Sequence, residues 1–333
     1  MIIDCHNHIL AAGAYPGYEK FIKEMTVEYF RSIGKLPTDR MPVDDDWKGL
    51  EYLWEPIDPQ VLIKDHDKAG VDKSVVLGVA PSEYTLYLIR GTIDLRGVTD
   101  VPGPPTIEKA NDYIAAVVKK YPDKLIGMAA VNPKFRGPEA AVEELERAIH
   151  GLKLTGLKLY PCYDHYSPND WELTYPLFEK AQQLGLLVMV HQSATPVIDA
   201  PLKYSRPYLL DDVGRKFREL KIMVCHAGLP WVEETMVMVA KHPNFSMDVS
   251  YLTSVYTRRE MYYFLKKAQA YGVRWSKICW GTDYPGFEFP ETLLPKFRTV
   301  NEEARSLGEP EIPEDEIEKM LGDYWLKAAG LKG

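Results

Sequence analysis

Short apolar runs alternate with longer amphipathic stretches along most of this 333-residue chain. A run such as Leu186–Val190 is apolar at every position, which is typical of a strand buried on both faces of a parallel sheet. The expected strands are Ile2–His8, Ser74–Val79, Leu125–Val131, Gly156–Tyr160, Leu186–His191, Ile222–His226, Phe245–Val249 and Ile278–Gly281. The expected helices are Ile107–Lys120, Pro138–His150, Tyr175–Leu184, Asp211–Leu220, Trp231–Lys241, Arg258–Tyr271, Glu291–Ser306 and Glu314–Ala329.

The spacing of these elements predicts the fold class. From the third strand onward the repeat is about 30 residues long, the size of one strand–helix unit. Eight such strands alternating with helices predict an α/β protein with a (β/α)8 TIM barrel. A doubly wound nucleotide-binding sheet would need a glycine-rich turn after its first strand, and Asn7–Leu10 contains no glycine.

Two segments are longer than a barrel requires. Residues 11–57 form an insertion after the first strand, with a helix-like piece at Tyr18–Ser32, and residues 81–105 form a Gly/Pro-rich loop after the second. Both follow the C-terminal end of a strand, where barrel active sites lie. We therefore expect two lids on a single domain spanning 1–333, which ends in a helical tail at 310–333.

The overall charge and the cysteine pattern exclude several classes of protein. Forty Lys and Arg against 48 Asp and Glu give a net charge of −8, which disfavours nucleic acid or an anionic membrane as the main partner. The four cysteines are far apart and form no CxxC pair, so neither a disulfide framework nor an all-cysteine zinc site is expected. No signal peptide or membrane span is recognisable, which predicts a cytoplasmic protein without membrane association.

Side chains that can bind a metal occur at the C-terminal ends of the expected strands. Residues two apart in a strand share a face, so Asp4, His6 and His8 should point together into the barrel. The further candidates, which end the fifth and sixth strands and follow the eighth, are His191, His226 and Asp283. Strand ends converge in a barrel, and these nitrogen and oxygen donors suit Zn²⁺, Mn²⁺, Fe²⁺ or Co²⁺.

The fourth strand and the loop after it carry further candidates. Lys158 should point inward with Tyr160, and a lysine inside a barrel requires a partner. It could bind an anionic substrate, pair with a nearby carboxylate, or form a carbamylated bridge between two metals. His165, in the loop after this strand, is a candidate for substrate contact. Asp248 on the seventh strand is either a simply buried carboxylate or an acceptor that orients a metal-binding histidine.

Three other residues are expected to lie away from the site. Cys5 and Cys225 precede His6 and His226, and neighbours in a strand face opposite sides. Both thiols should therefore pack against helices. His66 belongs to an amphipathic stretch and is expected to be solvated.

With these residues the chain resembles the amidohydrolase superfamily, in the amidohydrolase-2 branch that includes aminocarboxymuconate-semialdehyde decarboxylase. The matching segments are Asp4–His8, Gly156–Pro161, His191, Cys225–Gly228 and Trp280–Pro285. The likeness extends from residue 1 to about residue 290, with 11–57 poorly matched. It implies the barrel fold, a divalent metal site and a small-molecule substrate.

The resemblance also implies roles for individual residues. It assigns one divalent metal, zinc first, to His6, His8, His191 and Asp283. His226 would be the catalytic acid/base group, and Asp283 would be both ligand and proton acceptor. A two-metal site with carbamylated Lys158, as in dihydroorotase-like branches, is the less favoured alternative. A homodimer or homotetramer is expected from the family.

Relatives of this kind either hydrolyse amides, lactones and related bonds or decarboxylate unsaturated and aromatic acids. We favour the metal-dependent hydrolase, with the decarboxylase as the main alternative and a non-catalytic binding barrel as the third. The candidates for substrate binding are Lys158, Tyr160, His165 and Arg206. A decarboxylase should also offer arginines to the substrate carboxylate, and the candidates are Arg31, Arg40, Arg90, Arg96 and Arg206.

Overall fold

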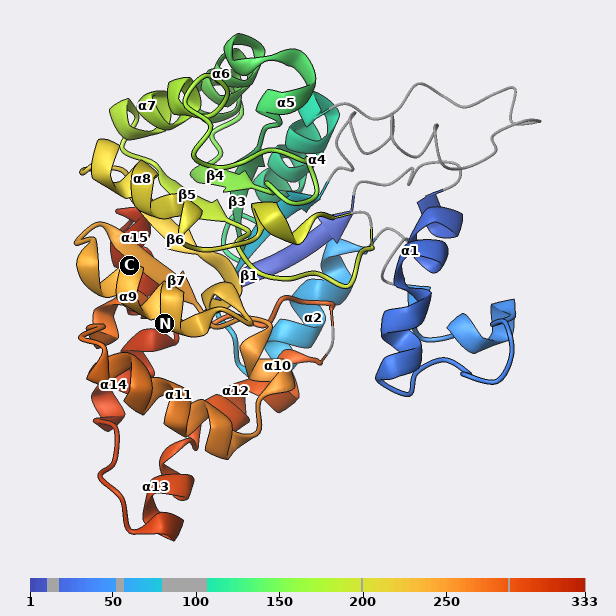
Figure 1. The fold of residues 1–333 in the computed structure, drawn as a ribbon, viewed down its shortest axis with the longest axis vertical. Helices are drawn as coiled ribbons and strands as arrows, with labels where there is room; N and C mark the ends of the chain where they lie inside the picture. The colour runs from blue at the N-terminus through green and yellow to red at the C-terminus, as the bar shows by residue number, and fades with distance from the viewer. Residues whose placement is uncertain (11–17, 52–56, 80–106, 199, 287, 333) are drawn as a thin grey trace.

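The computed structural model describes residues 1–10, 18–51, 57–79, 107–198, 200–286 and 288–332. Its eight parallel strands form one sheet in the order β1 to β8, and each strand pairs with the next along the chain (Figure 1). The strands are β1 (Ile3–Leu10), β2 (Lys73–Val79), β3 (Leu125–Ala130), β4 (Gly156–Leu159), β5 (Leu187–Val190), β6 (Lys221–Val224), β7 (Phe245–Asp248) and β8 (Ile278–Cys279). The predicted TIM barrel is confirmed.

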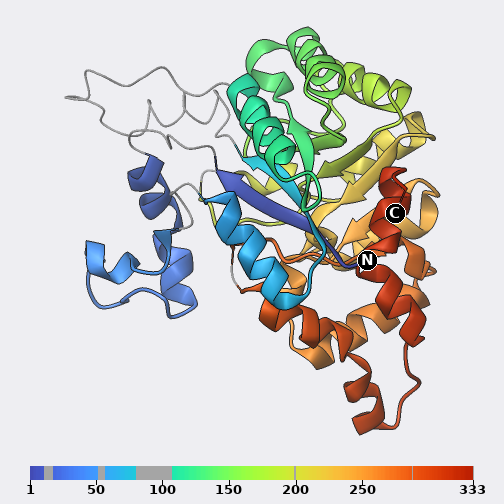
Figure 2. The ribbon, with the colours of Figure 1, turned by 180° about the vertical axis from the view of Figure 1, so that it is seen from behind.

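Helices surround the sheet and extend past it at the C-terminal end of the chain (Figures 1 and 2). They are α1 (Tyr18–Ser32), α2 (Pro59–Ala69), α4 (Ile107–Lys120), α5 (Pro133–Arg136), α6 (Pro138–Glu146), α7 (Tyr175–Gln183), α8 (Leu209–Lys216), α9 (Val232–Lys241), α10 (Leu252–Val255), α11 (Arg258–Ala270), α12 (Pro290–Arg298), α13 (Asn301–Leu307), α14 (Glu314–Met320) and α15 (Asp323–Ala329). The helix-like piece in the insertion coincides with α1.

The last two stretches were expected as single helices, and each is divided in two. α14 and α15 are separated at Gly322, where the chain passes close to β1. The N–H of Ile3 donates to the carbonyl of Leu321 at 2.7 Å, and a Cβ at Gly322 would lie 2.4 Å from the carbonyl of Met1. This close approach interrupts the helix, because no larger residue fits beside the first strand.

β8 is only two residues long, so the barrel is completed mainly by the segment that follows it. The N–H of Cys5 donates to Trp280 at 3.3 Å, and that of His8 donates to Tyr284 at 2.8 Å. Asn7 and Tyr284 form an isolated parallel bridge. The chain after β8 therefore runs beside β1, where the predicted metal ligands lie.

The barrel interior is filled from its N-terminal end. Ile3 and Cys5 of β1 belong to a buried cluster with Met189, Met223 and Trp325. Trp325 comes from α15, which lies beside the N-terminus (Figure 2). The predicted metal-binding side chains lie at the opposite end of the barrel, where the strands end.

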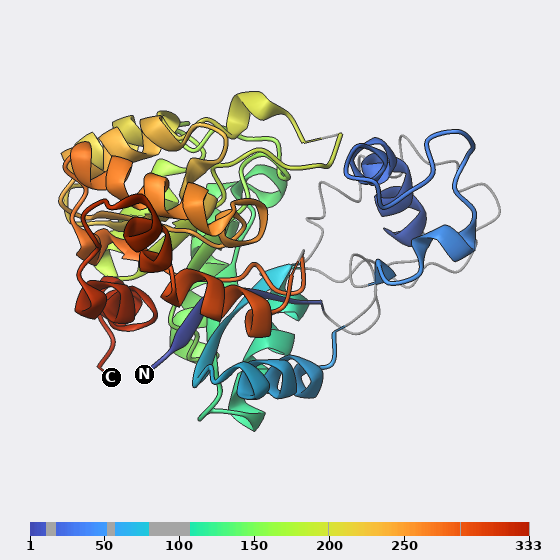
Figure 3. The same cartoon turned by 90° about the horizontal axis from the view of Figure 1, so that it is seen from below.

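The insertion after β1 contacts the barrel at Tyr29. α1 stands outside the ring of barrel helices (Figures 1 and 3), and the hydroxyl of Tyr29 lies 3.0 Å from that of Tyr251, after β7. The predicted loop at 81–105 lies outside the described residues, and with it Arg90 and Arg96. Among the helices that the structure describes, none combines the length and apolar character needed to cross a membrane.

Candidate metal centre

Three electron-pair donors meet at the C-terminal end of the barrel. Nε2 of His6 lies 3.5 Å from Oδ1 of Asp283, and Nε2 of His8 lies 3.1 Å from the same oxygen. The donor atoms of the three residues, which together form the donor group, all lie within 4.8 Å of one another. The N–H of Asp283 donates to the carbonyl of His6 at 2.9 Å, which holds the segment after β8 against β1. The structure thus brings together three of the four predicted ligands.

A register shift in β1 decides which side chains enter the barrel. The pairing with β2 slips between Asp4 and Asn7, so one extra residue is accommodated there. Cys5 and His6 both point inward as a result, and Asp4 points outward to His66 on α2, with 3.0 Å between Oδ2 and Nε2. The expectations that Asp4 shares a face with His6 and that Cys5 packs against helices are therefore wrong.

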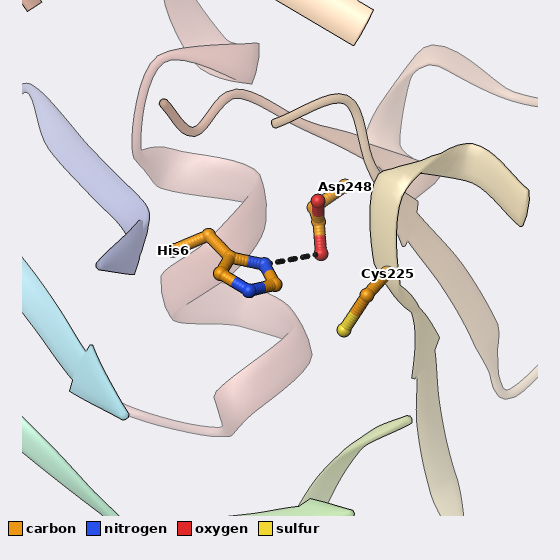
Figure 4. A group of neighbouring side chains, drawn as sticks. All are labelled: His6, Cys225 and Asp248. Carbon is orange, nitrogen blue, oxygen red and sulfur yellow. Dashed lines mark hydrogen bonds and ion pairs between the residues drawn. The ribbon is translucent and has the colours of Figure 1, made fainter. Parts of the chain in front are cut away.

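Asp248 orients the imidazole of His6. This is the second of the two alternatives predicted for Asp248, the first being a simply buried carboxylate. Nδ1 of His6 lies 3.2 Å from Oδ2 of Asp248 (Figure 4). Burial by itself raises the pKa of Asp248, but the neighbouring His6 and its hydrogen bond hold that pKa well below the usual range. An ionised Asp248 accepts a hydrogen bond from the Nδ1–H of His6. Nε2 of His6 then carries a lone pair, and it faces Oδ1 of Asp283.

His226 enters the site because the chain turns sharply after β6. Its backbone is left-handed, with φ 56°, and its N–H donates to Oδ1 of Asp248 at 3.0 Å. Nδ1 of His226 lies 2.8 Å from the hydroxyl of Ser250, which in turn lies 2.5 Å from Oδ1 of Asp248. Burial lowers the pKa of His226 to about 3, so its imidazole is neutral near pH 7.

Cys225 also points inward, which contradicts the expectation that it packs against helices. Cys225 lies two residues after Met223 of β6 and shares its inward-pointing face. Its sulfur points towards His6 and Asp248 (Figure 4). The left-handed turn then directs His226 to the same side, so two consecutive residues enter the barrel. Burial raises the pKa of Cys225 well above its usual value, which leaves the thiol protonated.

His191 lies beside the donor group rather than within it. Its Nδ1 is 3.2 Å from Nε2 of His226, and its Nε2 is 3.3 Å from the hydroxyl of Ser193. Burial lowers the pKa of His191 well below its usual value, so it too is neutral. Its role as a fourth ligand stays a prediction.

Lys158 lies inside the barrel with no exposed surface. Its Nζ is 3.2 Å from Nε2 of His6 and 3.1 Å from Sγ of Cys225, and it lies 5.0 Å from the ring centre of Tyr160. Within the described part of the chain, no carboxylate forms an ion pair with this amine. Pairing with a nearby carboxylate, one of the three alternatives for Lys158, is therefore not observed there.

Tyrosine rings stand against the imidazoles of the site. Tyr160 lies 6.4 Å from His8 between ring centres, and its hydroxyl donates to the carbonyl of Gly78. The further pairs are Tyr163 with His191, at 5.1 Å, and Tyr251 with His226, at 6.3 Å. Tyr163 was not singled out from the sequence, because nothing in a loop residue's local pattern indicates which histidine it will meet.

The other predicted substrate contacts occupy different surroundings. His165 is half-buried in the loop after β4 and has a left-handed backbone, with φ 57°. Arg206 forms an ion pair with Glu234 and lies over the ring of Trp231. Arg31 pairs with Glu28 and Arg40 with Asp46, both in the insertion. Substrate binding by any of these residues stays a prediction.

His66 is buried rather than solvated, with only 2% of its surface exposed. Its Nδ1 donates to the carbonyl of Leu62 at 2.8 Å, while Nε2 faces Asp4. It lies one helical turn after the buried Leu62, and the packing of α2 against β1 buries both.

The residues present fit a divalent cation. Nε2 of His6 and Oδ1 of Asp283 both carry lone pairs and face each other at 3.5 Å. Nδ1 of His8 is buried and, among the described residues, has no hydrogen-bond partner, while its Nε2 faces Asp283. A cation among these atoms would relieve the repulsion between the two acceptors, and imidazole with carboxylate is a common ligand set for Zn²⁺ and Mn²⁺.

Comparison with known proteins identifies relatives of this chain. A family model described as amidohydrolase matches residues 3–323. The 2-amino-3-carboxymuconate-6-semialdehyde decarboxylase of Dictyostelium discoideum is 30% identical over 154 residues, which make up 46% of this chain and 39% of the relative. The alignment thus spans less than half of either protein.

Several solved structures share the fold over nearly the whole chain. The 5-carboxyvanillate decarboxylase of Sphingomonas paucimobilis is 17% identical, with 99% of each chain covered and a TM-score of 0.63. A dihydroxybenzoic acid decarboxylase of Polaromonas sp. JS666, with bound manganese, is 18% identical, with 99% of this chain and 96% of the other covered and a TM-score of 0.63. The 4-oxalomesaconate hydratase of Rhodopseudomonas palustris is 17% identical, with coverage of 99% and 96% and a TM-score of 0.58.

Proposed function

Since this chain belongs to the amidohydrolase family, whose model spans residues 3–323, we propose that it is a metal-dependent decarboxylase of a small unsaturated or aromatic carboxylic acid. The sequence favoured a hydrolase, with decarboxylation as the alternative. The named relatives support the alternative, because the Dictyostelium protein and two of the three structures described above are decarboxylases. The third structure is a hydratase, and hydratase activity is one of the results that the substrate screen can give.

The observation that carries this proposal is the environment of Lys158. Its amine is fully buried beside the donor group and, within the described part of the chain, faces no carboxylate. A buried amine is costly unless a partner satisfies it. The carboxylate of an acid substrate is such a partner, and it would place the bond to be broken next to His226.

We infer that one divalent ion per chain is held by His6, His8, His191 and Asp283. Manganese in the Polaromonas relative makes Mn²⁺ a first candidate beside the Zn²⁺ expected from the sequence, with Fe²⁺ and Co²⁺ as alternatives. Such an ion would polarise the oxygen atoms of the substrate.

The side chains around this site would supply the rest of the chemistry. Decarboxylation replaces the bond between carbon and CO₂ by a bond between carbon and a proton, so a proton must be delivered to the substrate carbon. His226 and Asp283 are the groups that would hold and move it, because neutral His226 can accept a proton and return it. The rings of Tyr160, Tyr163 and Tyr251 would pack against a planar substrate.

A substrate screen tests the proposal. The Mn²⁺- or Zn²⁺-loaded protein is incubated with hydroxybenzoates and unsaturated dicarboxylic acids, and CO₂ release is followed together with loss of the acid. Equal amounts of CO₂ formed and acid consumed are expected for at least one member. Turnover of lactones or cyclic amides without CO₂ release would assign a hydrolase instead, and addition of water to an unsaturated acid would assign a hydratase.

Three further expectations belong to this proposal. The enzyme is expected to form a homodimer or homotetramer and to reside in the cytoplasm. The net charge of −8 supports a small molecule rather than nucleic acid as the partner. A local excess of positive charge from the metal and Lys158 would still admit an anionic substrate to an otherwise acidic protein.

A further inference from the structure

The carboxylate of Asp4 joins the two chain segments that carry the donor group. Oδ1 accepts from the N–H of His6 at 3.2 Å and from the N–H of Thr282 at 3.0 Å. Oδ2 accepts from the hydroxyl of Thr282 at 2.5 Å. One fully buried side chain thus binds β1 at its metal-binding histidine and the chain beside Asp283.

This junction is where the barrel has the least regular pairing. β8 ends at Cys279, before the chain reaches Asp283, and β1 changes register between Asp4 and Asn7. Backbone hydrogen bonds at Cys5, His8 and Asp283 do join the two segments, but they lie outside a regular strand pair. The carboxylate of Asp4 adds side-chain hydrogen bonds to this backbone contact, at the N–H groups of His6 and Thr282.

His66 supports Asp4 from the helix outside the barrel. Nδ1 of His66 donates to the carbonyl of Leu62 at 2.8 Å, and Nε2 lies 3.0 Å from Oδ2 of Asp4. The ring of Tyr284 meets the imidazole edge-on at 5.2 Å between ring centres. The imidazole is therefore fixed on three sides, and it holds Oδ2 in place for Thr282.

We propose that Asp4 and His66 are positioning residues that set the spacing of the metal ligands His6, His8 and Asp283 without touching the metal. The inference rests on the proposed function, because it assumes that these ligands bind a divalent ion. It predicts that loss of the His66 imidazole weakens metal binding through Asp4 and Thr282, although His66 lies on the opposite side of β1 from the donor group.

The test measures the affinity of the purified full-length protein for Mn²⁺, by the electron paramagnetic resonance signal of the free ion. H66L removes the support of Asp4 and is expected to weaken Mn²⁺ binding by about 10- to 100-fold. H66Q keeps a donor near the position of Nε2 and is expected to stay within about threefold of the wild type. T282V, which removes only the hydroxyl, is a second variant that acts on the same carboxylate.

H242L is the matched control. His242 is also buried and also bonded to an aspartate, with 2.7 Å between its Nε2 and Oδ1 of Asp211, but this pair joins α8 to the residue that follows α9, on the outside of the barrel. The control should lower thermal stability as H66L does and leave Mn²⁺ affinity unchanged.

The possible results separate the two proposals. Wild-type affinity for Mn²⁺ in both H66L and T282V, or an equal loss in H242L, would overturn the positioning role alone. If the wild type itself binds neither Mn²⁺ nor Zn²⁺, the proposed function fails and this inference fails with it.

Discussion

Nε2 of His226 lies 3.2 Å from Nδ1 of His191, and the neighbouring hydrogen bonds determine where the protons are. Ser250 donates to the ionised Asp248, so its oxygen accepts the Nδ1 proton of His226. Nε2 of His226 is then unprotonated and accepts from His191. This leaves the other nitrogen of His191 as an acceptor, which is the protonation state a metal ligand requires.

Replacing His226 with Asn should abolish turnover while the metal stays bound. The proton-transfer group is lost, which typically costs about 100-fold or more in kcat, whereas the predicted ligands remain. Decarboxylation rate and metal content of the same preparation give the answer, with H150N on the exposed surface as the control. Loss of metal together with activity would make His226 a ligand and contradict the assigned roles.

Replacing Asp248 with Asn should weaken metal binding by about 10- to 100-fold. The carboxylate holds the Nδ1 proton of His6, and an amide can present a donor to that nitrogen and turn the imidazole. Competition titration with a fluorescent chelator measures the effect. D211N removes a carboxylate of a histidine–aspartate pair outside the barrel and should have no effect, so equal loss in both variants would refute an orienting role for Asp248.

Replacing Lys158 with Met should leave about one metal ion per chain and raise the KM for the acid substrate. The amine is expected to bind the substrate carboxylate, and a charged hydrogen bond contributes about 1.5–3 kcal/mol, or roughly 10- to 150-fold in affinity. Elemental analysis and steady-state kinetics measure the two quantities. A fall from two ions to one would favour the carbamylated bridge instead.

The metal-free protein should lose stability as the pH is lowered through the range below about 6.5. Burial lowers the pKa values of His6, His191 and His226, the last to about 3, whereas in the unfolded chain these groups titrate near 6.5. For His226 the unfolded state binds more protons between about pH 6.5 and pH 3, so this residue disfavours folding by ~1.4 kcal/mol per pH unit in that range, and His6 and His191 act in the same direction. Above about pH 6.5 this contribution to stability is fully present.

Urea denaturation in the presence of a chelator, repeated from about pH 7.5 to about pH 5, checks this dependence. H226Q cannot take up the proton and should show a shallower decline than the wild type, whereas H150Q should match the wild type. An unchanged decline in H226Q would mean that His226 is not the buried neutral group described here.

Replacing Tyr29 with Phe should raise the KM by up to about tenfold with little change in kcat. Its hydroxyl is 3.0 Å from that of Tyr251, which links the insertion to the residue that packs on His226. A neutral hydrogen bond contributes about 0.5–1.5 kcal/mol. Y271F, which loses a hydroxyl contact with Glu233 on the outer helices, is the control. A fall in kcat at constant KM would instead place Tyr29 in the chemical step.

The barrel and most of the site were predictable from local pattern. Continuous apolar runs identify buried strands, and parallel strands in a barrel bring their C-terminal ends together. His6, His8, His191, His226 and Asp283 could therefore be grouped before any coordinates were known. Their separation in sequence did not matter, because the fold class alone makes strand ends converge.

The tertiary structure decided the orientation of the side chains that strict strand alternation places on the wrong face. A register shift turned Cys5 inward and Asp4 outward, and a left-handed backbone at His226 directed its imidazole to the side that Cys225 already faces. Both are backbone irregularities whose energy is balanced by distant contacts, so no short window of sequence reveals them. His66 is the clearest case, because its partner is 62 positions away and only the packing of α2 on β1 joins them. The sequence by itself determined which groups meet at the barrel's end, and the packing of distant segments determined how each is held there.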